Sequence, residues 1–439
     1  MGLGIQGGGM GVARYFAKHG TNVLVTDLKT ETELESSIAQ LQTFPNIQFR
    51  LGGHEDEDFL SADCIVKGPS IRWDNPYIEK ALQKNIPVIM ESAYFAKHTK
   101  ATLVGITGTR GKTTTTHMIH SVLQKFYTKG KIYLSGNIPG SCAIELLDKA
   151  NADDIVILEL SSWQLSGFHR EEVSPKYAVF TNVYEDHLNH YKDMGDYVHD
   201  KTAIFRYQKP QDSLITTAKA LENFRKNTIT IPSAIVECTT DDYPSELLHM
   251  RGDHNKLNAA LAQKTAQLIL PETDPHKITQ EIRETHAVNF RQQIVTQSGN
   301  IVVVNDTTST TPTSAIIAIE TFTDKKIVLV LGGNSKNLSL QGLAETIIKN
   351  VERIHAIILL EGSMTDEIVP ILSSIEKLQV SSVHKNFTQA VQDAYRVALE
   401  ADEPIYLLFS PGATSFAQFR NEFDRGEKFN AIISDIIKK

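Results

Sequence analysis

The segment from Gly105 to Thr114, which reads G-I-T-G-T-R-G-K-T-T, carries the residues best suited to bind phosphate. It follows the apolar run Ala101–Val104 and leads into a helix-compatible stretch, Thr114–Phe126. A strand, a glycine-rich loop, Lys-Thr and a helix form the layout of a P-loop, in which backbone N–H groups and a helix N-terminus surround phosphates. The sequence therefore predicts a nucleoside triphosphate site, although Ile106 stands where the strict pattern has its first glycine.

Two side chains of this loop have distinct chemistry. The Lys112 ammonium would neutralise the outer phosphates, and the Thr113 hydroxyl would ligate Mg²⁺. The residues predicted to contact ATP from the loop are Gly108, Thr109, Arg110, Gly111, Lys112, Thr113 and Thr114.

Further charged residues follow two apolar, strand-like runs downstream. Glu159 lies at the end of the run Asp154–Leu160, where an acid near a P-loop is a natural second Mg²⁺ ligand. Asp186 and His187 follow the next run, and open α/β sheets bind their ligands at such carboxyl ends. We interpret His187 as functional because it lies beside an acid in a chain with a triphosphate site. Lys201 opens the following helix, and its spacing alone indicates a solvated surface charge.

The last part of the chain has three stretches of small and hydroxylated residues, Asn305–Thr311, Leu331–Lys336 and Ser410–Phe416. Each follows a strand-like run. Several hydroxyls, exposed N–H groups and one lysine at strand ends would form an anion pocket suited to a carboxylate substrate. The hydroxyls of the first stretch could equally serve only as helix caps.

These residues must be positioned by alternating strands and helices, which indicate parallel sheets covered by helices. We predict an α/β protein of three domains: an N-terminal Rossmann-like domain (residues 1–97), a central P-loop ATPase domain with a mostly parallel sheet (98–288) and a C-terminal Rossmann-like domain (289–439). The N-terminal glycines, Gly7 to Gly11, form a dinucleotide-type turn before a predicted helix from Val12 to His19 and a strand that closes with an acid.

The bulk composition excludes several classes of protein. The chain has 439 residues, 41% apolar and 22% charged, and a net charge of −8 argues against a nucleic-acid-binding surface. No apolar run approaches the roughly 20 residues that span a bilayer. The three cysteines lack metal or disulfide spacing, so we expect core positions for them and a reducing cytoplasm for the protein. We expect a monomer with neither nucleic-acid nor membrane partners.

The chain resembles the Mur ligase family along essentially its whole length. The resemblance rests on five segments: Gly105–Thr114 (family T-G-T-N-G-K-[ST]-T), Leu158–Gln164 (E-L-S-S-[FW]-Q), Asn182–Tyr191 (N-x-x-x-D-H-[LM]-D), His254–Ala260 (H-N-x-x-N-x-x-A) and Ser410–Gly426, which is similar to the signature of the branch that adds D-glutamate. This resemblance implies ATP-driven amide synthesis. The carboxylate of UDP-N-acetylmuramoyl-L-alanine would become an acyl phosphate, from which D-glutamate displaces phosphate during peptidoglycan synthesis.

The resemblance also implies roles for individual residues. The implied Mg²⁺ ligands are Glu159, His187 and Lys201, the last as a CO₂-derived carbamate. The implied further contacts to ATP are Asn255, Asn258, Arg291 and Asp306. The implied contacts to the UDP-sugar substrate are Ile5, Leu28, Lys29 and Asn137. The implied contacts to the amino acid are Thr310, Lys336, Ser415 and Phe423.

Departures from the family pattern leave alternatives open. Arg110 replaces an asparagine, Thr308 stands where a lysine is usual, and Glu422-Phe423 inverts the order of the aromatic position. A sibling Mur-type or folylpolyglutamate-type ligase therefore remains an alternative, although the Asp-Asn-Pro-Arg run of the diaminopimelate- or lysine-adding sibling does not occur. A non-catalytic nucleotide-binding protein is the rival of another class. Whether Met1 is the true start stays open.

Overall fold

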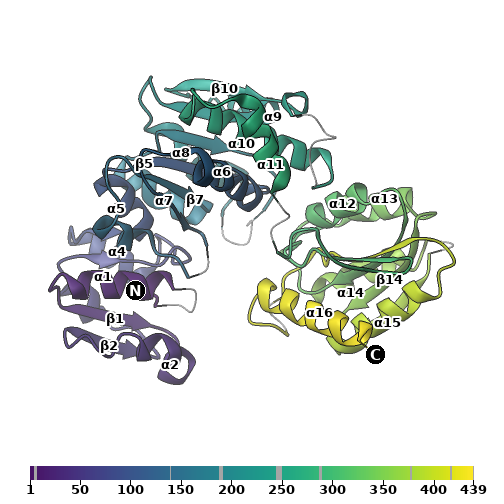
Figure 1. The fold of residues 1–439 in the computed structure, drawn as a ribbon. Helices are drawn as coiled ribbons and strands as arrows, with labels where there is room; N and C mark the ends of the chain where they lie inside the picture. Colours follow the sequence, from purple (N-terminus) through teal and green to yellow (C-terminus); the bar gives the residue numbers. More distant parts are fainter. Residues whose placement is uncertain are drawn as a thin grey trace. The chain divides into compact units, whose positions relative to one another are not determined.

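The computed structural model describes residues 1–3, 7–138, 140–186, 191–243, 250–285, 289–375, 378–415 and 418–438. By their internal contacts the residues form two compact units, which we treat separately. Unit 1 comprises Met1–Val183, Gly195–Leu248 and His254–Thr285, and unit 2 comprises Tyr184–Met194, His249–Asp253 and His286–Lys439. Figure 1 labels the elements of both along the chain.

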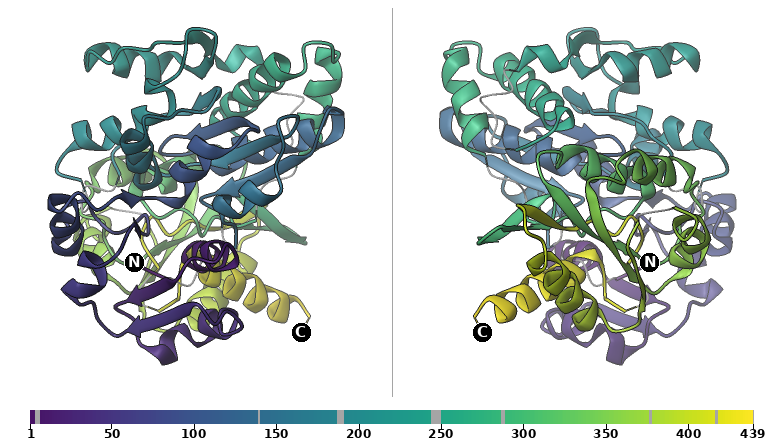
Figure 2. Two further views of the ribbon diagram at one scale, coloured as in Figure 1. Left: turned by 90° about the vertical axis from the view of Figure 1, so that its left-hand side faces the viewer. Right: turned by 90° about the vertical axis from the view of Figure 1, so that its right-hand side faces the viewer.

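The N-terminal part of unit 1 contains two pairs of short parallel strands. The strands are β1 (Val23–Asp27), β2 (Ile47–Leu51), β3 (Ile65–Val66) and β4 (Val88–Ile89). Strands β1 and β2 pair, side by side in the left view of Figure 2, and β3 pairs with β4. The Gly2 N–H donates to Thr26 O at 2.8 Å and the Met1 amine to Val66 O at 2.9 Å. The first residues thus bridge the two pairs in the place of the strand before the glycine-rich turn. The helices are α1 (Gly8–Lys18), α2 (Glu31–Ala39), α3 (Asp56–Leu60), α4 (Pro76–Gln83) and α5 (Glu91–His98).

Helix α1 starts at Gly8, so the predicted start at Val12 was wrong. Gly7 caps the helix with φ of +96°, in the left-handed region that glycine adopts without strain. A Cβ on Gly9 would lie 2.5 Å from the carbonyl oxygens of both Gly2 and Leu3. Gly8, Gly9 and Gly11 therefore belong to the helix. Position 9 must be glycine because a side chain there would collide with the backbone of Gly2 and Leu3.

The central part of unit 1 is a six-stranded sheet in the order β10-β9-β8-β5-β7-β6, with every pair parallel. Its strands are β5 (Thr102–Thr107), β6 (Ile132–Gly136), β7 (Ile155–Glu159), β8 (Tyr177–Phe180), β9 (Ser213–Thr217) and β10 (Ala234–Cys238). Its helices are α6 (Lys112–Phe126), η1 (Ala143–Asp148), α7 (Ser162–Glu171), α8 (Met194–Arg206), α9 (Ala218–Lys226), η2 (Thr240–Asp242), α10 (Asp253–Ile269) and α11 (Pro275–Glu284). Burial on both faces explains why β7 is apolar at successive positions.

The sheet of unit 2 has the order β11-β12-β16-β13-β14-β15, and all pairs are parallel except β11 with β12. Its strands are β11 (Gln293–Ser298), β12 (Ile301–Asn305), β13 (Lys326–Gly332), β14 (Ile354–Leu360), β15 (Val380–His384) and β16 (Ile405–Phe409). Its helices are α12 (Pro312–Thr321), α13 (Gln341–Lys349), α14 (Ser363–Leu372), α15 (Phe387–Leu399) and α16 (Glu422–Ile437). Apolar residues of α12, α13 and α14 pack on one face of this sheet, and those of α15 and α16 on the other.

The α/β fold with parallel sheets is confirmed, and the domain boundaries at 97/98 and 288/289 stay predictions. Helix α5 runs to His98, so the first of these boundaries falls in its last turn. The core prediction for the cysteines was wrong for Cys64, which is exposed, whereas Cys142 and Cys238 are buried. Among the described residues, no helix is long and apolar enough to cross a membrane.

Candidate active site

The phosphate loop connects β5 to α6 at the carboxyl edge of the central sheet. Its glycines adopt conformations that other residues avoid, with φ of +146° at Gly108 and +82° at Gly111. Helix α6 begins at Lys112, so its free first-turn N–H groups lie at the loop. A Cβ on Gly111 would lie 2.3 Å from Asn258 Oδ1. The structure therefore places the predicted adenine-binding helix α10 directly against the phosphate loop.

The Lys112 side chain folds back over this loop. Its Nζ donates to the carbonyl oxygens of Gly108 at 3.0 Å and Thr109 at 3.2 Å. A phosphate oxygen would be a stronger partner for the ammonium than these neutral carbonyls, because both members of the pair would be charged. Thr113 and Thr114 lie in the first turn of α6, and their roles toward a bound phosphate and its metal ion stay predictions.

Glu159 ends β7 and is only 3% exposed. Its Oε1 accepts a hydrogen bond from Asn137 Nδ2 at 3.2 Å. Its Oε2 is buried and has no hydrogen-bond partner among the described residues. A buried carboxylate oxygen without a partner is costly, so it points to a bound cation or water. The donor set therefore fits Mg²⁺, which prefers carboxylate and hydroxyl oxygens and keeps several waters.

Lys201 is 2% exposed, so its interpretation as a surface charge was wrong. Helix α8 turns this side chain inward, where Nζ donates to Gly108 O at 3.0 Å and Thr107 Oγ1 at 3.4 Å. The ammonium also lies 4.8 Å from the ring centroid of Tyr197, one turn earlier on α8. The Tyr197 hydroxyl shares a hydrogen bond of 3.1 Å with Thr109 Oγ1. Sequence reasoning missed Tyr197, although its spacing of four from Lys201 would have put both on one helix face.

The remaining predicted residues of unit 1 are placed as follows. Asn258 Nδ2 donates to Asn255 Oδ1 at 3.2 Å, and both side chains are buried. Leu28 is 71% exposed beside Lys29, whose N–H donates to Asp27 Oδ1 at 3.0 Å. Ile5 and His187 lie outside the described residues, so their predicted roles have no structural counterpart here.

A second cluster of potential metal ligands in unit 1 consists of His169, His199 and Asp200. His169 Nε2 lies 2.8 Å from the His199 carbonyl oxygen, so this nitrogen carries the proton. Its Nδ1 then accepts from the Tyr207 hydroxyl at 3.0 Å. Burial lowers the pKa of His169 to about 4. Both ring nitrogens are thus already engaged, and the cluster is a poorer cation site than the edge at Glu159.

In unit 2, Asp306 follows β12 and is buried. Its carboxylate accepts from Ser410 Oγ at 2.8 Å and from the Gln292 N–H at 3.1 Å. The neighbouring Arg291, predicted with Asp306 to contact ATP, is half-buried. Asp306 therefore ties together the ends of β12 and β16 and the chain before β11.

The predicted amino-acid contacts come from three loops of unit 2. Lys336 Nζ lies 3.4 Å from Thr310 Oγ1 and 3.3 Å from Oδ1 of Asp186, which belongs to unit 2 by its contacts. The Ser415 side chain is 3% exposed, and its Oγ has no hydrogen-bond partner among the described residues. Phe423 lies in the first turn of α16, where its ring centroid is 6.3 Å from that of Phe290. The structure thus brings Thr310 and Lys336 together, and the role of Ser415 toward an amino acid stays a prediction.

Arg425 is a residue of this region that sequence reasoning missed as a site residue. It is 1% exposed; Nη2 donates to Thr307 O at 2.7 Å, and Nη1 donates to Ala413 O at 3.2 Å. Burial lowers its pKa to about 10, so the guanidinium stays charged at neutral pH. It therefore holds the loop after β12 and the loop after β16 together. The sequence offered no signal for this role, because nothing in the local pattern shows that Arg425 is buried.

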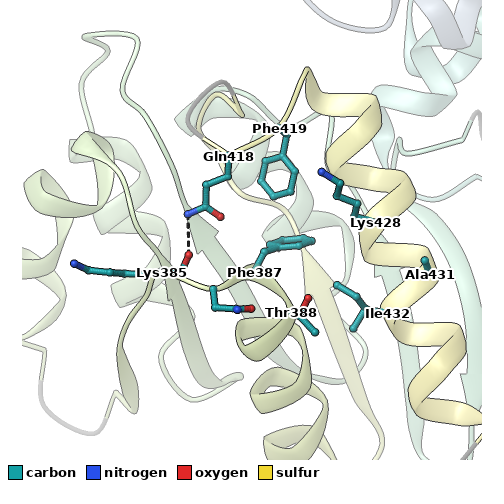
Figure 3. A pocket seen from close by; sticks show the side chains of 9 residues that line it. Lys385, Phe387, Thr388, Gln418, Phe419, Lys428, Ala431 and Ile432 are labelled. Carbon is teal, nitrogen blue, oxygen red and sulfur yellow. Dashed lines mark hydrogen bonds between the residues drawn. The ribbon is translucent and has the colours of Figure 1, made fainter.

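A pocket of about 490 Å³ lies in unit 2 between the start of α15 and α16 (Figure 3). Phe387, Phe419 and Ile432 line it, and the Lys428 ammonium at its rim is bound to Asp424 Oδ2 at 3.1 Å. None of the residues predicted to act on a substrate lines this pocket.

A parallel sheet with a phosphate loop and an unsatisfied buried acid at its carboxyl edge defines a P-loop nucleotide-binding protein. Two protein families match the chain: "Mur ligase middle domain" at residues 106–242 and "Mur ligase MurD-like, N-terminal domain" at residues 1–90. A protein of Roseiflexus sp. (strain RS-1) named UDP-N-acetylmuramoylalanine--D-glutamate ligase is 33% identical, covering 99% of this chain and 97% of its own. A protein of the same name from Borreliella afzelii (strain PKo) is 31% identical, and the match covers 99% of this chain and 96% of that protein. The chain belongs to the Mur ligase family.

Solved structures share the fold. MurF from Acinetobacter baumannii superposes with a TM-score of 0.60 at 15% identity, covering 96% of this chain and 92% of that one. MurF ligase from Thermotoga maritima, solved in complex with ADP, has a TM-score of 0.58 at 17% identity, covering 85% of this chain and 94% of its own. Folylpolyglutamate synthase from Mycobacterium tuberculosis has a TM-score of 0.55 at 12% sequence identity, covering 77% of this chain and 92% of its own. The fold alone therefore does not separate the family's activities.

Proposed function

We propose that this protein is an ATP-dependent ligase that joins D-glutamate to UDP-N-acetylmuramoyl-L-alanine in peptidoglycan synthesis. The observation that carries the proposal is the convergence of the phosphate loop, the partly unsatisfied Glu159 and the buried Lys201 at one sheet edge. A charged cradle of this kind is suited to phosphoryl transfer, in which positioning and charge stabilisation supply most of the catalysis. The two full-length relatives that bear this ligase's name support the substrate assignment.

The first step would activate a carboxylate that is otherwise a poor acyl donor. A carboxylate oxygen of the sugar-nucleotide bonds to the γ-phosphorus while the bond to the β,γ-bridging oxygen breaks, which releases ADP and leaves an acyl phosphate. Lys112 would stabilise the charge that develops on the phosphoryl oxygens. Thr113, Glu159 and His187 would hold Mg²⁺, which supplies further charge neutralisation when bound.

The second step would use the loops of unit 2. The free amine of D-glutamate bonds to the acyl carbon, loses a proton and expels phosphate through a tetrahedral intermediate. Lys336 and Thr310 would bind a carboxylate of the amino acid, and Ser415 offers an unpaired hydroxyl to it. Phe423 would pack against the ligand. Because Asp306 and Arg291 would contact ATP, the two steps require unit 2 to close on the nucleotide.

The other assignments extend this proposal to the whole chain. Residues 1–97 would bind the UDP-sugar through Ile5, Leu28 and Lys29, with Asn137 contacting the sugar-peptide. Residues 98–288 would bind ATP, with Asn255 and Asn258 at the adenine, and residues 289–439 would bind the amino acid. Since ATP and nucleotide sugars are cytoplasmic metabolites, we place the reaction in the cytoplasm.

Lys201 is proposed to act as a carbamate formed with CO₂, which would convert a cation into an anionic metal ligand. Its burial at the phosphate loop supports a role at the site rather than on the surface. We expect Lys201→Ala to be inactive in ATP turnover and to regain part of its activity with a short carboxylate such as acetate. A fully active Lys201→Ala would rule out the carbamate.

The decisive assay measures ADP release and peptide formation with Mg²⁺, ATP, UDP-N-acetylmuramoyl-L-alanine and one amino acid at a time. D-Glutamate should give product, whereas L-glutamate, L-lysine and meso-diaminopimelate should not. Product with another amino acid would identify a sibling ligase. Nucleotide binding with no release of ADP under any combination would identify a non-catalytic binding protein.

A further inference from the structure

The two residues that follow β8, Thr181 and Asn182, support the phosphate loop through four hydrogen bonds. The Asn182 side chain binds both main-chain groups of Arg110: the Arg110 N–H donates to Oδ1 at 2.9 Å, and Nδ2 donates to the Arg110 carbonyl at 3.1 Å. The Asn182 carbonyl accepts from the Thr109 N–H at 2.9 Å. Thr181 Oγ1 donates to the same Arg110 carbonyl at 2.5 Å.

From these contacts we propose that Thr181 and Asn182 are positioning residues that hold the phosphate loop in its binding conformation before ATP arrives. Neither side chain needs to touch the nucleotide. Four hydrogen bonds from two consecutive residues fix Thr109 and Arg110, the two residues between the glycines of the loop. A preformed anion site avoids the ordering cost that a mobile loop would add to binding.

The packing at Gly108 also fixes the phosphate loop against Thr181 and Asn182. A Cβ at this position would lie 1.9 Å from Thr181 Oγ1 and 3.0 Å from the Asn182 N–H nitrogen. The loop therefore lies directly on the Thr181–Asn182 backbone, and only glycine leaves room for the contact. The glycine of the motif and the two polar residues after β8 form one unit, although more than 70 residues separate them in the sequence.

This arrangement also explains how the loop accommodates its departure from the family pattern. Asn182 and Thr181 bind main-chain atoms of residue 110, so these contacts do not require a particular side chain there. An arginine in place of asparagine is therefore compatible with the same loop geometry.

The inference rests on the proposed role of this loop in holding ATP, and it is tested by direct binding. Calorimetric titration of the full chain with MgATP, without amino acid or sugar-nucleotide, gives the dissociation constant for ATP. We expect Thr181→Val and Asn182→Ala to raise it about tenfold or more, as expected for a buried carbonyl or N–H that loses its partner. Thr181→Ser, which keeps the hydroxyl, should restore tight binding. In turnover, KM for ATP should rise more than kcat falls.

Thr216→Val is the matched control. Thr216 is buried on the adjacent strand β9, and its Oγ1 donates to the Phe180 carbonyl at 2.8 Å. Both valine variants lose one buried hydroxyl-to-carbonyl bond, but only Thr181→Val removes it from the phosphate loop. Equal dissociation constants for ATP in the two variants would overturn the proposal.

Hydrogen exchange of the unmutated protein provides a test that does not depend on the variants folding. The amides of Thr109 and Arg110 should be protected without nucleotide, because both N–H groups are bonded to Asn182. Exchange at the unprotected rate in the nucleotide-free protein would overturn the proposal. A protein that binds ATP and shows this protection but makes no peptide would contradict the ligase assignment alone.

Discussion

The phosphate loop of unit 1 and the amino-acid loops of unit 2 both lie at carboxyl edges of parallel strands, but they are built differently. The phosphate loop is one short continuous segment whose glycines and main-chain groups form the site. The proposed amino-acid site would be assembled from loops after three strands, with Thr310, Lys336 and Ser415 each on a different one. Arg425, on a fourth segment, holds two of these loops together from beneath.

This difference determines which substitutions disrupt each site and how readily each site can be recognised from the sequence. A continuous loop can be recognised from a short stretch of sequence, because its binding groups are main-chain atoms whose positions depend on the local backbone conformation. A dispersed site depends on side chains that hold distant segments in register, so its integrity is tied to the stability of the whole unit. Four substitutions sharpen this comparison.

Lys112→Ala should have the largest effect, lowering kcat on the order of 10³-fold, because a cation that stabilises transition-state charge is lost. The fold should be largely unaffected, since the two carbonyls that Nζ binds belong to its own loop and are neutral. Steady-state ADP release measures the effect. Lys125→Ala, on the same helix but paired with Glu281, is the control and should retain turnover. Substantial turnover by Lys112→Ala would refute the phosphate role.

Gly111→Ala should weaken ATP binding on the order of a hundredfold, since the new Cβ would lie 2.3 Å from Asn258 Oδ1. Gly20→Ala provides a control with nearly the same φ, +81° against +82°, and with nothing within 4 Å of the added Cβ. Both variants carry the backbone strain, but only one carries the clash. Calorimetry should show equal ATP affinity for Gly20→Ala and the unmutated protein.

Arg425→Met should destabilise unit 2 by about 2 kcal/mol, because the carbonyls of Thr307 and Ala413 lose their buried donor. The KM for D-glutamate should rise as the two loops separate. Urea denaturation and initial rates measure the two effects. Arg353→Met is the control in the same unit, because Arg353 also binds buried carbonyls, those of Phe322 and Ile319. Arg353→Met should lower the stability of unit 2 without changing the KM for D-glutamate. An equal rise of this KM in both variants would contradict the role of Arg425.

Ser415→Ala should have the smallest effect, a rise in KM for D-glutamate of about tenfold with no loss of stability. The hydroxyl has no partner among the described residues, so its removal costs the folded protein nothing. Ser92→Ala, which removes a buried and likewise unpartnered hydroxyl from unit 1, should leave KM unchanged. An unaltered KM for Ser415→Ala would remove that residue from the amino-acid site.

Sequence reasoning succeeded where chemistry is local. It placed Lys112 in a glycine-rich loop just before a helix and Glu159 near the end of a strand, because hydrophobic runs and glycine spacing are read along the chain. The helix itself starts at Lys112, two residues before the expected Thr114. The argument from spacing alone was wrong for Lys201, whose burial depends on which face of α8 meets the loop, whereas the family resemblance had assigned this residue to the site. It was also wrong for the start of α1, because glycines that allow close packing look the same in sequence as glycines that form a turn.

The order of strands and helices, the phosphate loop and the identity of its reacting groups were determined by the sequence itself, since each follows from residue types at short spacing. Only the tertiary structure decided that Asn182 holds the backbone of Arg110, that Tyr197 and Lys201 face the same loop, and that Arg425 is buried beneath the amino-acid loops. These relations join residues that are close in space but distant along the chain. They arise because buried polar groups must find partners wherever the fold places them.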